Sequence, residues 1–147
     1  MPTETVYGLG GLASSPVAVA DIFRVKGRPS GHPVIVHISD PTEIRFWSDS
    51  PPETALAIAE AFWPGPITVV VPKAESALPA ITGGQGTIAL RSASHPIFRE
   101  VLSELAALGI NHPGIAAPSA NRFGQVSPTT AAHVWSELGE YLGQHDL

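Results

Sequence analysis

KGRPSGHPVIVHI, residues 26–38, joins the end of a predicted helix to the start of a predicted strand. Before it, residues 16–26 place apolar side chains at helical spacing, with Ser15 as candidate N-cap and Gly27 as the residue that ends the helix. Within it, residues 33–38 are rich in β-branched side chains and too short for a helix, which is typical of a buried strand. The stretch therefore predicts a helix, a rigid turn and a buried strand in succession.

The same alternation continues along the rest of the chain. Helical spacing recurs in 51–63, 95–109 and 127–139, and strand-like apolar runs occur in 67–71, 87–91 and 114–120. Gly109 is expected to end the second of these helices, and Ser127 to cap the third with Pro128 at its first position. Alternating strands and helices predict a single α/β domain whose ligands bind at strand ends.

The composition argues against several classes of protein. The chain has 147 residues, is 44% hydrophobic, and carries a formal net charge of −5 with 14% charged residues. So little positive charge excludes a general basic face for nucleic acid, and any anion must be bound locally. No apolar run approaches the roughly 20 residues of a membrane span, and no secretory-signal pattern begins the chain, so we expect a cytoplasmic protein with no membrane partner. The absence of cysteine excludes disulfides and a cysteine nucleophile.

The few basic residues lie at turns and strand ends. Lys26 and Arg28 surround a glycine, and Arg91 ends the strand predicted over 87–91. An arginine there can bind a carboxylate or phosphate with two hydrogen bonds, or take part in a buried salt bridge. Lys26 can equally cap the carbonyl end of its helix. The glycine-rich segment 82–86 matches neither the Walker pattern nor the dinucleotide fingerprint, so a flexible hairpin is its simpler interpretation.

Small polar residues gather in the loop 117–129. Ser119, Asn121 and the start of the following helix can together contact a phosphate or a ribose, although Ser127 is also an ordinary helix cap. His37 interrupts an apolar strand and must be hydrogen-bonded if it is buried, so a satisfied core histidine is the default interpretation. No two histidines are four residues apart, and no carboxylates pair outside helix surfaces. We therefore expect neither a protein-bound metal nor a two-carboxylate hydrolase.

Five segments, taken in order, resemble the YrdC/Sua5 family across nearly the whole chain. They are PTETVYGLG (2–10), KGRPSGHPVIVHI (26–38), FWPGPITVVV (62–71), TIALR (87–91) and APSANRFGQVSPTTAAHV (117–134). The resemblance implies an α/β fold with a YrdC-like open twisted sheet, flanking helices and a concave nucleotide-binding groove. It also implies a nucleotidyltransferase, an L-threonylcarbamoyladenylate synthase that condenses L-threonine, bicarbonate or CO2 and ATP into threonylcarbamoyl-AMP and pyrophosphate. ATP would bring Mg2+ with it.

The resemblance further implies a role for each scattered polar residue. The family's K-x-R and S-x-N signatures are present as Lys26 with Arg28 and Ser119 with Asn121, which we expect to be catalytic. The residues that match ATP-contacting positions are Arg28, His32, Thr87, Ser119 and Ser127. The residues that match threonine-binding positions are Thr5, His37, Arg91 and Ala117. In this interpretation the rigid turn fixes two cations to face a triphosphate before the nucleotide arrives, which lowers the ordering cost of binding.

The sequence also departs from the family's pattern. Family members ordinarily have a helix and a strand before the segment 2–10, and a further strand and a threonine-binding serine after the last helix. The position often held by asparagine is His32 here. We therefore expect residues 1–147 to form one YrdC-like domain, truncated at both ends and without the C-terminal domain of the longer Sua5 form. Exposed strand edges would then favour pairing with another chain, and the activity would be reduced.

The product of such an enzyme feeds the t6A modification at position 37 of tRNAs, so tRNA would be met indirectly, through a partner threonylcarbamoyl transferase. Two other functions stay open. One is a relative of hydrogenase-maturation domains that adenylates carbamoyl groups from carbamoyl phosphate, which the intact PTETVYGLG segment disfavours. The other is a non-catalytic module for tRNA or double-stranded RNA, against which the net charge of −5 counts.

Overall fold

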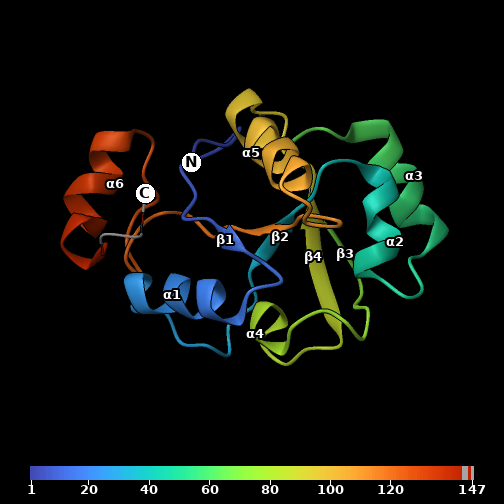
Figure 1. Cartoon of the computed structure of the whole chain (residues 1–147), viewed down its shortest axis with the longest axis horizontal. Helices are drawn as coiled ribbons and strands as arrows, with labels where there is room; N and C mark the ends of the chain where they lie inside the picture. The colour runs from blue at the N-terminus through green and yellow to red at the C-terminus, as the bar shows by residue number, and fades with distance from the viewer. Residues whose placement is uncertain (144–145, 147) are drawn as a thin grey trace.

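A five-stranded mixed sheet organises the part of the chain that the computed structural model describes, residues 1–143 and 146 (Figure 1). Across the sheet the strands follow the order β1 (Gly11–Leu12), β5 (Ile115–Ala116), β2 (Ile35–His37), β4 (Thr87–Arg91) and β3 (Val69–Pro72). The strands β2 and β4 are parallel, and the other neighbours are antiparallel. Open, twisted and flanked by helices, the sheet confirms the predicted fold class.

Six helices flank this sheet. They are α1 (Pro16–Lys26), α2 (Ile44–Trp47), α3 (Glu53–Phe62), α4 (Pro79–Thr82), α5 (Pro96–Ala107) and α6 (Ala131–Leu138), with short 3-10 turns at Pro41–Glu43 and Gly139–Tyr141. The first helix is bounded as the sequence predicts: the Ser15 side chain accepts a hydrogen bond from the Ala18 N–H, and Gly27 adopts a left-handed conformation with φ of 59°. Lys26 is the last residue of α1, so the end of this helix positions a residue that the sequence predicts to be catalytic. None of the described helices is long and apolar enough to cross a membrane.

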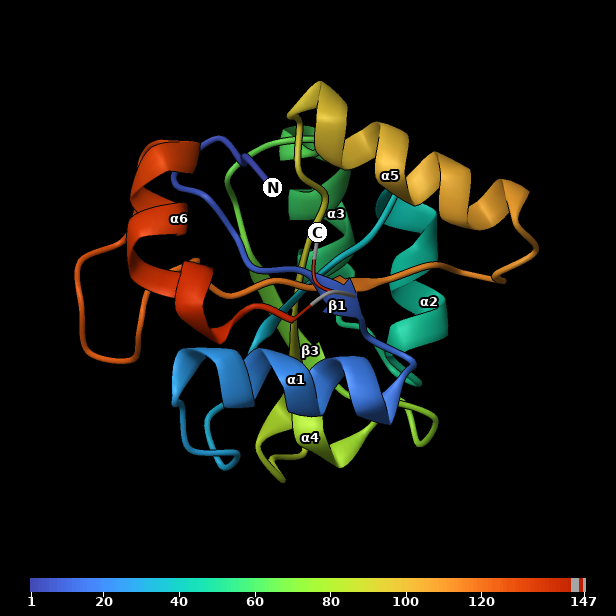
Figure 2. The ribbon, with the colours of Figure 1, turned by 60° about the vertical axis from the view of Figure 1, so that its left-hand side comes forward.

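The helices cover the two faces of the sheet unequally. Helices α1 to α4 pack against one face, where Val36, Ile88 and Leu90 are buried in a shared core (Figures 1 and 2). Helix α5 lies over the opposite face, where Phe98 belongs to a smaller cluster with side chains of β5. This smaller cluster leaves part of the second face uncovered.

The uncovered part of the second face is visible in the burial of β4. Ile88 and Leu90 are buried, whereas Thr87 is exposed, and Ala89 and Arg91 are only partly covered. Successive strand residues point to opposite faces, so Thr87, Ala89 and Arg91 line one open face of the sheet. At a strand rise of about 3.3 Å per residue, Thr87 and Arg91 are separated by roughly 13 Å.

The last helix begins later than the sequence predicts. Residues 127–139 were expected to be helical with Ser127 as N-cap, but α6 starts at Ala131 and Thr130 caps it by accepting from the His133 N–H. The reason is a competing contact, because the Pro128 carbonyl accepts a hydrogen bond from the Tyr7 N–H of the N-terminal segment. Residues 127 and 128 are thereby held in the loop that precedes the helix.

Candidate functional site

Parallel pairing of β2 and β4 brings His37 and Arg91 side by side. They are register partners at the last position of each strand, so their side chains share the open face. The Arg91 Nε donates to the Thr68 Oγ1 at 2.9 Å, which fixes the guanidinium while its two terminal nitrogens have no hydrogen-bond acceptor among the described residues. Burial lowers the pKa of Arg91, and the Glu4 charge partly offsets this. Arginine held this way presents a fork that suits a carboxylate.

His37 is buried and electrically neutral. Its residue surface is 2% exposed and its ring lies 4.5 Å from the Phe98 ring, centroid to centroid. Burial, and then the Arg91 charge, lower its pKa to about 4. Its Nδ1 is buried without a hydrogen-bond partner in the described part of the chain, so the satisfied core histidine that the sequence favoured is not what the structure contains. A buried polar atom in this state is available to a ligand.

A turn near the N-terminus places Glu4 close to these residues, and Thr5 follows Glu4 in the same turn. Residues Pro2 and Tyr7 form an antiparallel bridge, and the Thr3 Oγ1 donates to the Val6 carbonyl at 2.7 Å. Thr5 is exposed at the tip of this turn. The Glu4 Oε1 accepts a hydrogen bond from the Ser94 N–H, just beyond β4. Desolvation opposes ionisation of Glu4, but hydrogen bonds with Ser94 and the Arg91 charge hold its pKa below the ordinary value.

Lys26 is held inside the protein at the end of α1. It is 2% exposed, and its Nζ donates to the carbonyl oxygens of Ser119 and Asn121 at 2.5 Å each. Burial lowers its pKa to about 8, and the charges of Arg28 and Arg122 act in the same direction. Two of the three ammonium protons therefore bind the loop after β5, and Lys26 joins that loop to α1.

Arg28 follows the left-handed glycine and lies over the ring of Phe123. Its Nη2 donates to the Pro33 carbonyl at 2.7 Å, and its Cζ lies 6.0 Å from the Phe123 ring centroid. The His32 ring meets the same Phe123 ring edge-on at 5.3 Å. Phe123, which is 46% exposed, therefore brings the two predicted ATP residues together. The Arg28 Nε is buried and has no hydrogen-bond partner in residues 1–143 and 146.

The loop after β5 carries the predicted Ser119 and Asn121. Ser119 forms an antiparallel bridge with Gly8, which ties this loop to the N-terminal segment. The Asn121 Nδ2 donates to the Arg122 and Gln125 carbonyls at 2.7 and 2.8 Å, and it leaves the buried Oδ1 without a partner among the described residues. The loop is thus closed on itself, and one amide oxygen remains to accept a hydrogen bond.

Most of the predicted residues, together with Glu4, fall into two groups, and Thr5 is included as the chain neighbour of Glu4. The first, which we call the strand-end group, contains Glu4, Thr5, His37 and Arg91. The second, which we call the loop group, contains Lys26, Arg28, His32, Ser119 and Asn121. Ala117 lies between them, because its N–H donates to the Ile35 carbonyl of β2 while Ser119 follows two residues later. No side-chain hydrogen bond in the described residues joins Thr87 or Ser127 to either group.

Buried polar atoms without partners concentrate in and beside the two groups. Seven such side-chain atoms occur in the described part of the chain. Four of them belong to Glu4, Arg28, His37 and Asn121, and a fifth to His95, next to Ser94. Buried polar atoms are normally hydrogen-bonded, so this concentration indicates a site for a polar ligand. No three His, Asp or Glu side chains in residues 1–143 and 146 are grouped to hold a metal ion.

Several residues in the site escaped the sequence analysis. Thr68 and Ser94 lie in segments far from their partners, and only the sheet pairing brings them to Arg91 and Glu4. Phe123 had a local signal, since it is an aromatic residue two positions after Asn121 in a loop of small residues. Arg122 donates through Nη1 to the Val25 carbonyl at 2.7 Å and so ties the loop to α1.

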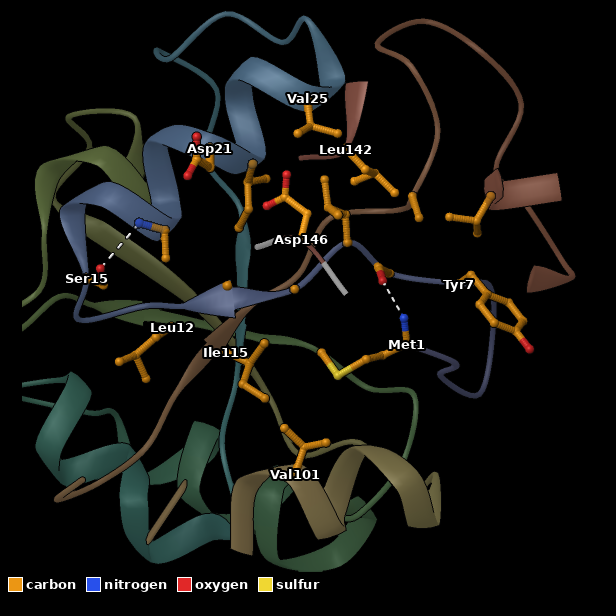
Figure 3. A pocket seen from close by; sticks show the side chains of 18 of the residues that line it. Met1, Tyr7, Leu12, Ser15, Asp21, Val25, Val101, Ile115, Leu142 and Asp146 are labelled. Atoms are coloured by element: carbon orange, nitrogen blue, oxygen red, sulfur yellow. Dashed lines mark hydrogen bonds between the residues drawn. The ribbon is translucent and has the colours of Figure 1, made fainter. Parts of the chain in front are cut away.

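A cavity of about 910 Å³ lies elsewhere, between α1, α5, α6 and the β1 edge (Figure 3). Its lining is mainly apolar, with side chains such as Val101, Ile115 and Leu142, and it contains none of the predicted site residues. The charged groups in its lining are the carboxylates of Asp21 and Asp146 and the N-terminal ammonium of Met1, which donates to the Gly8 carbonyl, so two anions oppose one cation. Size alone therefore does not make this cavity the candidate site.

Comparison with known proteins gives consistent results. The family model Sua5_yciO_yrdC, described as "Telomere recombination", matches residues 1–143. The threonylcarbamoyl-AMP synthase of Pyrococcus abyssi is 45% identical over 133 residues, and that of Bacillus subtilis is 42% identical over 138 residues. The matches cover 90% and 93% of this chain but only 37% and 38% of the relatives. The crystal structure of P. abyssi Sua5 complexed with L-threonine superposes with a TM-score of 0.87 at 44% identity, covering 97% of this chain and 40% of that one.

Proposed function

The chain belongs to the Sua5/YciO/YrdC family, as the five motifs predict, and on that basis we propose that it acts as an L-threonylcarbamoyladenylate synthase. In this proposal L-threonine, bicarbonate or CO2 and ATP are condensed to threonylcarbamoyl-AMP with release of pyrophosphate. The named relatives are threonylcarbamoyl-AMP synthases, and this chain spans less than two-fifths of their length. The activity, substrates and partners are therefore inferred from the site.

The observation that carries the proposal is the pair of incompletely satisfied polar groups, the strand-end group and the loop group. The strand-end group offers a guanidinium, a carboxylate and a neutral imidazole, which suits a small zwitterion. The loop group offers two cations and an amide oxygen, which suits a phosphate chain and a nucleoside. An amino acid and a nucleotide bound in these places would meet near Ala117, which lies between the two groups.

At the strand-end group we assign the threonine. Arg91 would bind its carboxylate through the two terminal nitrogens that Thr68 leaves unoccupied. His37 would accept or donate one hydrogen bond as a neutral ring, while Thr5 and the region of Ala117 close the sides. This assignment leaves the amino group of threonine available for reaction with CO2.

At the loop group we assign ATP. Arg28 would bind phosphate oxygens. Lys26 would supply a second positive charge, and it holds the loop of Ser119 and Asn121 in place. His32 and Phe123 form one wall, and Thr87 and Ser127 would contact the nucleotide from outside the loop group. Mg2+ would enter as part of the nucleotide substrate.

The chemistry then requires positioning rather than a protein nucleophile. The neutral amine of threonine attacks CO2 and loses a proton, giving an N-carboxylate. An oxygen of that carboxylate attacks the α-phosphorus of ATP, and the bond to the β-phosphate oxygen breaks as pyrophosphate leaves. Negative charge grows on the leaving group, next to Lys26 and Arg28, and its neutralisation lowers the barrier.

The test is pyrophosphate release by the purified chain from ATP and bicarbonate, with and without L-threonine. We expect release that depends on threonine and is lost in Arg91→Ala but kept in Arg45→Ala, an exposed arginine of α2. Release that occurs without threonine but with carbamoyl phosphate would favour the carbamoyl-adenylating alternative. Salt-sensitive RNA binding without any release would favour the RNA-binding module.

We further propose that the product is passed to a partner transferase that modifies tRNA, so that tRNA does not bind the groove itself. A net charge of −5 supports this, because two clustered cations inside a groove cannot provide the extended basic surface that an RNA backbone requires. Mixing experiments with radiolabelled threonine would show label in tRNA only when such a transferase is added.

A further inference from the structure

Glu4 is the one acidic side chain in the strand-end group, and the contacts assigned to threonine above leave open which Glu4 atom would bind the substrate. One of its oxygens is already used, because Oε1 accepts from the Ser94 N–H. That bond and the Thr3-stabilised turn hold the carboxylate in place from two sides. The other oxygen, Oε2, is buried and has no hydrogen-bond partner in the described part of the chain. A buried carboxylate oxygen left in this state is costly unless something else binds it.

Glu4 and Arg91 are opposite charges that lie near each other without forming an ion pair. Each shifts the pKa of the other, and both act on the pKa of His37. The ion pairs of the described residues nevertheless join Arg24 with two aspartates and His112 with Glu43, and none joins Glu4 with Arg91. The two charged groups therefore do not pair directly with each other, and a ligand with one charge of each sign can bind to both.

An α-amino acid is such a ligand. Its carboxylate and ammonium groups are attached to the same carbon, so it can bind a guanidinium and a carboxylate at once. We propose that the Glu4 Oε2 accepts a hydrogen bond from the ammonium group of the amino-acid substrate while Arg91 binds its carboxylate. Glu4 thereby selects an amino acid over the corresponding hydroxy acid. This assignment rests on the proposed function and adds a specificity-determining residue to it.

Glu4 is a binding residue in this assignment and takes no proton. The hydrogen bond from Ser94 and the charge of Arg91 stabilise the ionised carboxylate, so Glu4 is a weak base. The ammonium proton must leave to water or bicarbonate before the amine attacks CO2. The predicted effect of removing the Glu4 charge therefore falls on substrate binding.

Calorimetric titration of the purified chain with L-threonine and with its deaminated analogue, 2,3-dihydroxybutanoate, tests the assignment. The parent should bind threonine more tightly than the hydroxy acid. In Glu4→Gln, which keeps an acceptor for Ser94, threonine affinity should fall by roughly 10- to 100-fold, the value of a hydrogen bond between charged groups. Affinity for the hydroxy acid should stay within about twofold. Glu60→Gln, on the exposed surface of α3, serves as the matched control.

Three results would overturn the assignment. Unchanged threonine binding in Glu4→Gln would remove Glu4 from the site, and an equal loss of both ligands would make its role structural. If Glu4→Gln fails to fold, the comparison of the two ligands on the parent chain tests the assignment by itself. Equal affinity of the parent for threonine and for the hydroxy acid would show that no group recognises the ammonium. A parent that binds no threonine would instead refute the proposed function itself, which separates the two failures.

Discussion

The buried ammonium of Lys26 predicts an unusual dependence of stability on pH. In the unfolded chain the pKa of this lysine is near its ordinary value of 10.5, and burial lowers it to about 8 in the folded protein. Between these two values the unfolded state binds more protons than the folded state, so the free energy of unfolding rises as the pH rises. Because the residue is only 2% exposed, the whole pKa difference between the unfolded and the folded state contributes to the free energy of unfolding, which changes by about 3 kcal/mol.

The perturbation is Lys26→Met, which keeps the apolar stem and removes the charge. At neutral pH two effects oppose each other: the buried charge disappears, but the Ser119 and Asn121 carbonyls lose their donor at a cost of roughly 1–3 kcal/mol each. The slope of stability with pH is therefore more informative than stability at any single pH. Urea unfolding of both chains, from below pH 8 to about pH 10.5, measures that slope.

We expect the parent to gain about 3 kcal/mol over this range relative to Lys26→Met. Lys73→Met, which removes the other lysine of the chain from a partly exposed position, should follow the parent. Parallel curves for the parent and Lys26→Met would refute the reasoning, since Lys26 would then have the same pKa in both states. ATP binding, measured in the same series, should weaken in the parent as Lys26 loses its proton above pH 8.

Three further predictions concern the strand-end group and the turn after α1. Arg91→Lys should raise the KM for threonine by roughly 10- to 100-fold with little change in kcat, because lysine cannot form the paired contact, and an unchanged KM from initial rates of pyrophosphate release would contradict this. Gly27→Ala should lower the free energy of unfolding by about 1 kcal/mol or more, since φ is 59° and a Cβ would lie 2.6 Å from the Arg122 Nη2. A melting temperature equal to that of the parent would disprove the close contact. The pKa of His37 is about 4 in the folded protein, so the free energy of unfolding should fall as the pH falls from 6.5 towards 4, because the unfolded state takes up the proton first. Urea unfolding of His37→Gln should not show this loss of stability. Equal losses in the parent and in the variant would argue against a buried neutral ring.

The fold could be predicted from local signals where those signals were strong. Ser15 and Gly27 bound α1 as expected, and the β-branched run 33–38 contains β2. The last helix was placed too early because the Tyr7 N–H binds the Pro128 carbonyl, and a contact between residues so far apart in sequence leaves no local pattern. Short elements such as β1 and α4 are too brief to show periodicity.

The candidate site was predicted in its residue types but not in its contacts. The sequence placed Lys26 toward a triphosphate, and the structure directs its Nζ to two loop carbonyls. Glu4 was not among the predicted site residues, because its proximity to Ser94 and Arg91 depends on how the N-terminal turn meets the end of β4. Roles that arise from such long-range contacts require the folded structure.

The most direct test of the central claim is identification of the reaction product by mass spectrometry. The purified chain would be incubated with ATP, Mg2+, L-threonine and ¹³C-labelled bicarbonate. We predict a threonylcarbamoyl-adenylate whose mass includes the heavy carbon, and which disappears when threonine is omitted. Formation of ADP or AMP alone, or of an adenylate without the labelled carbon, would contradict the account.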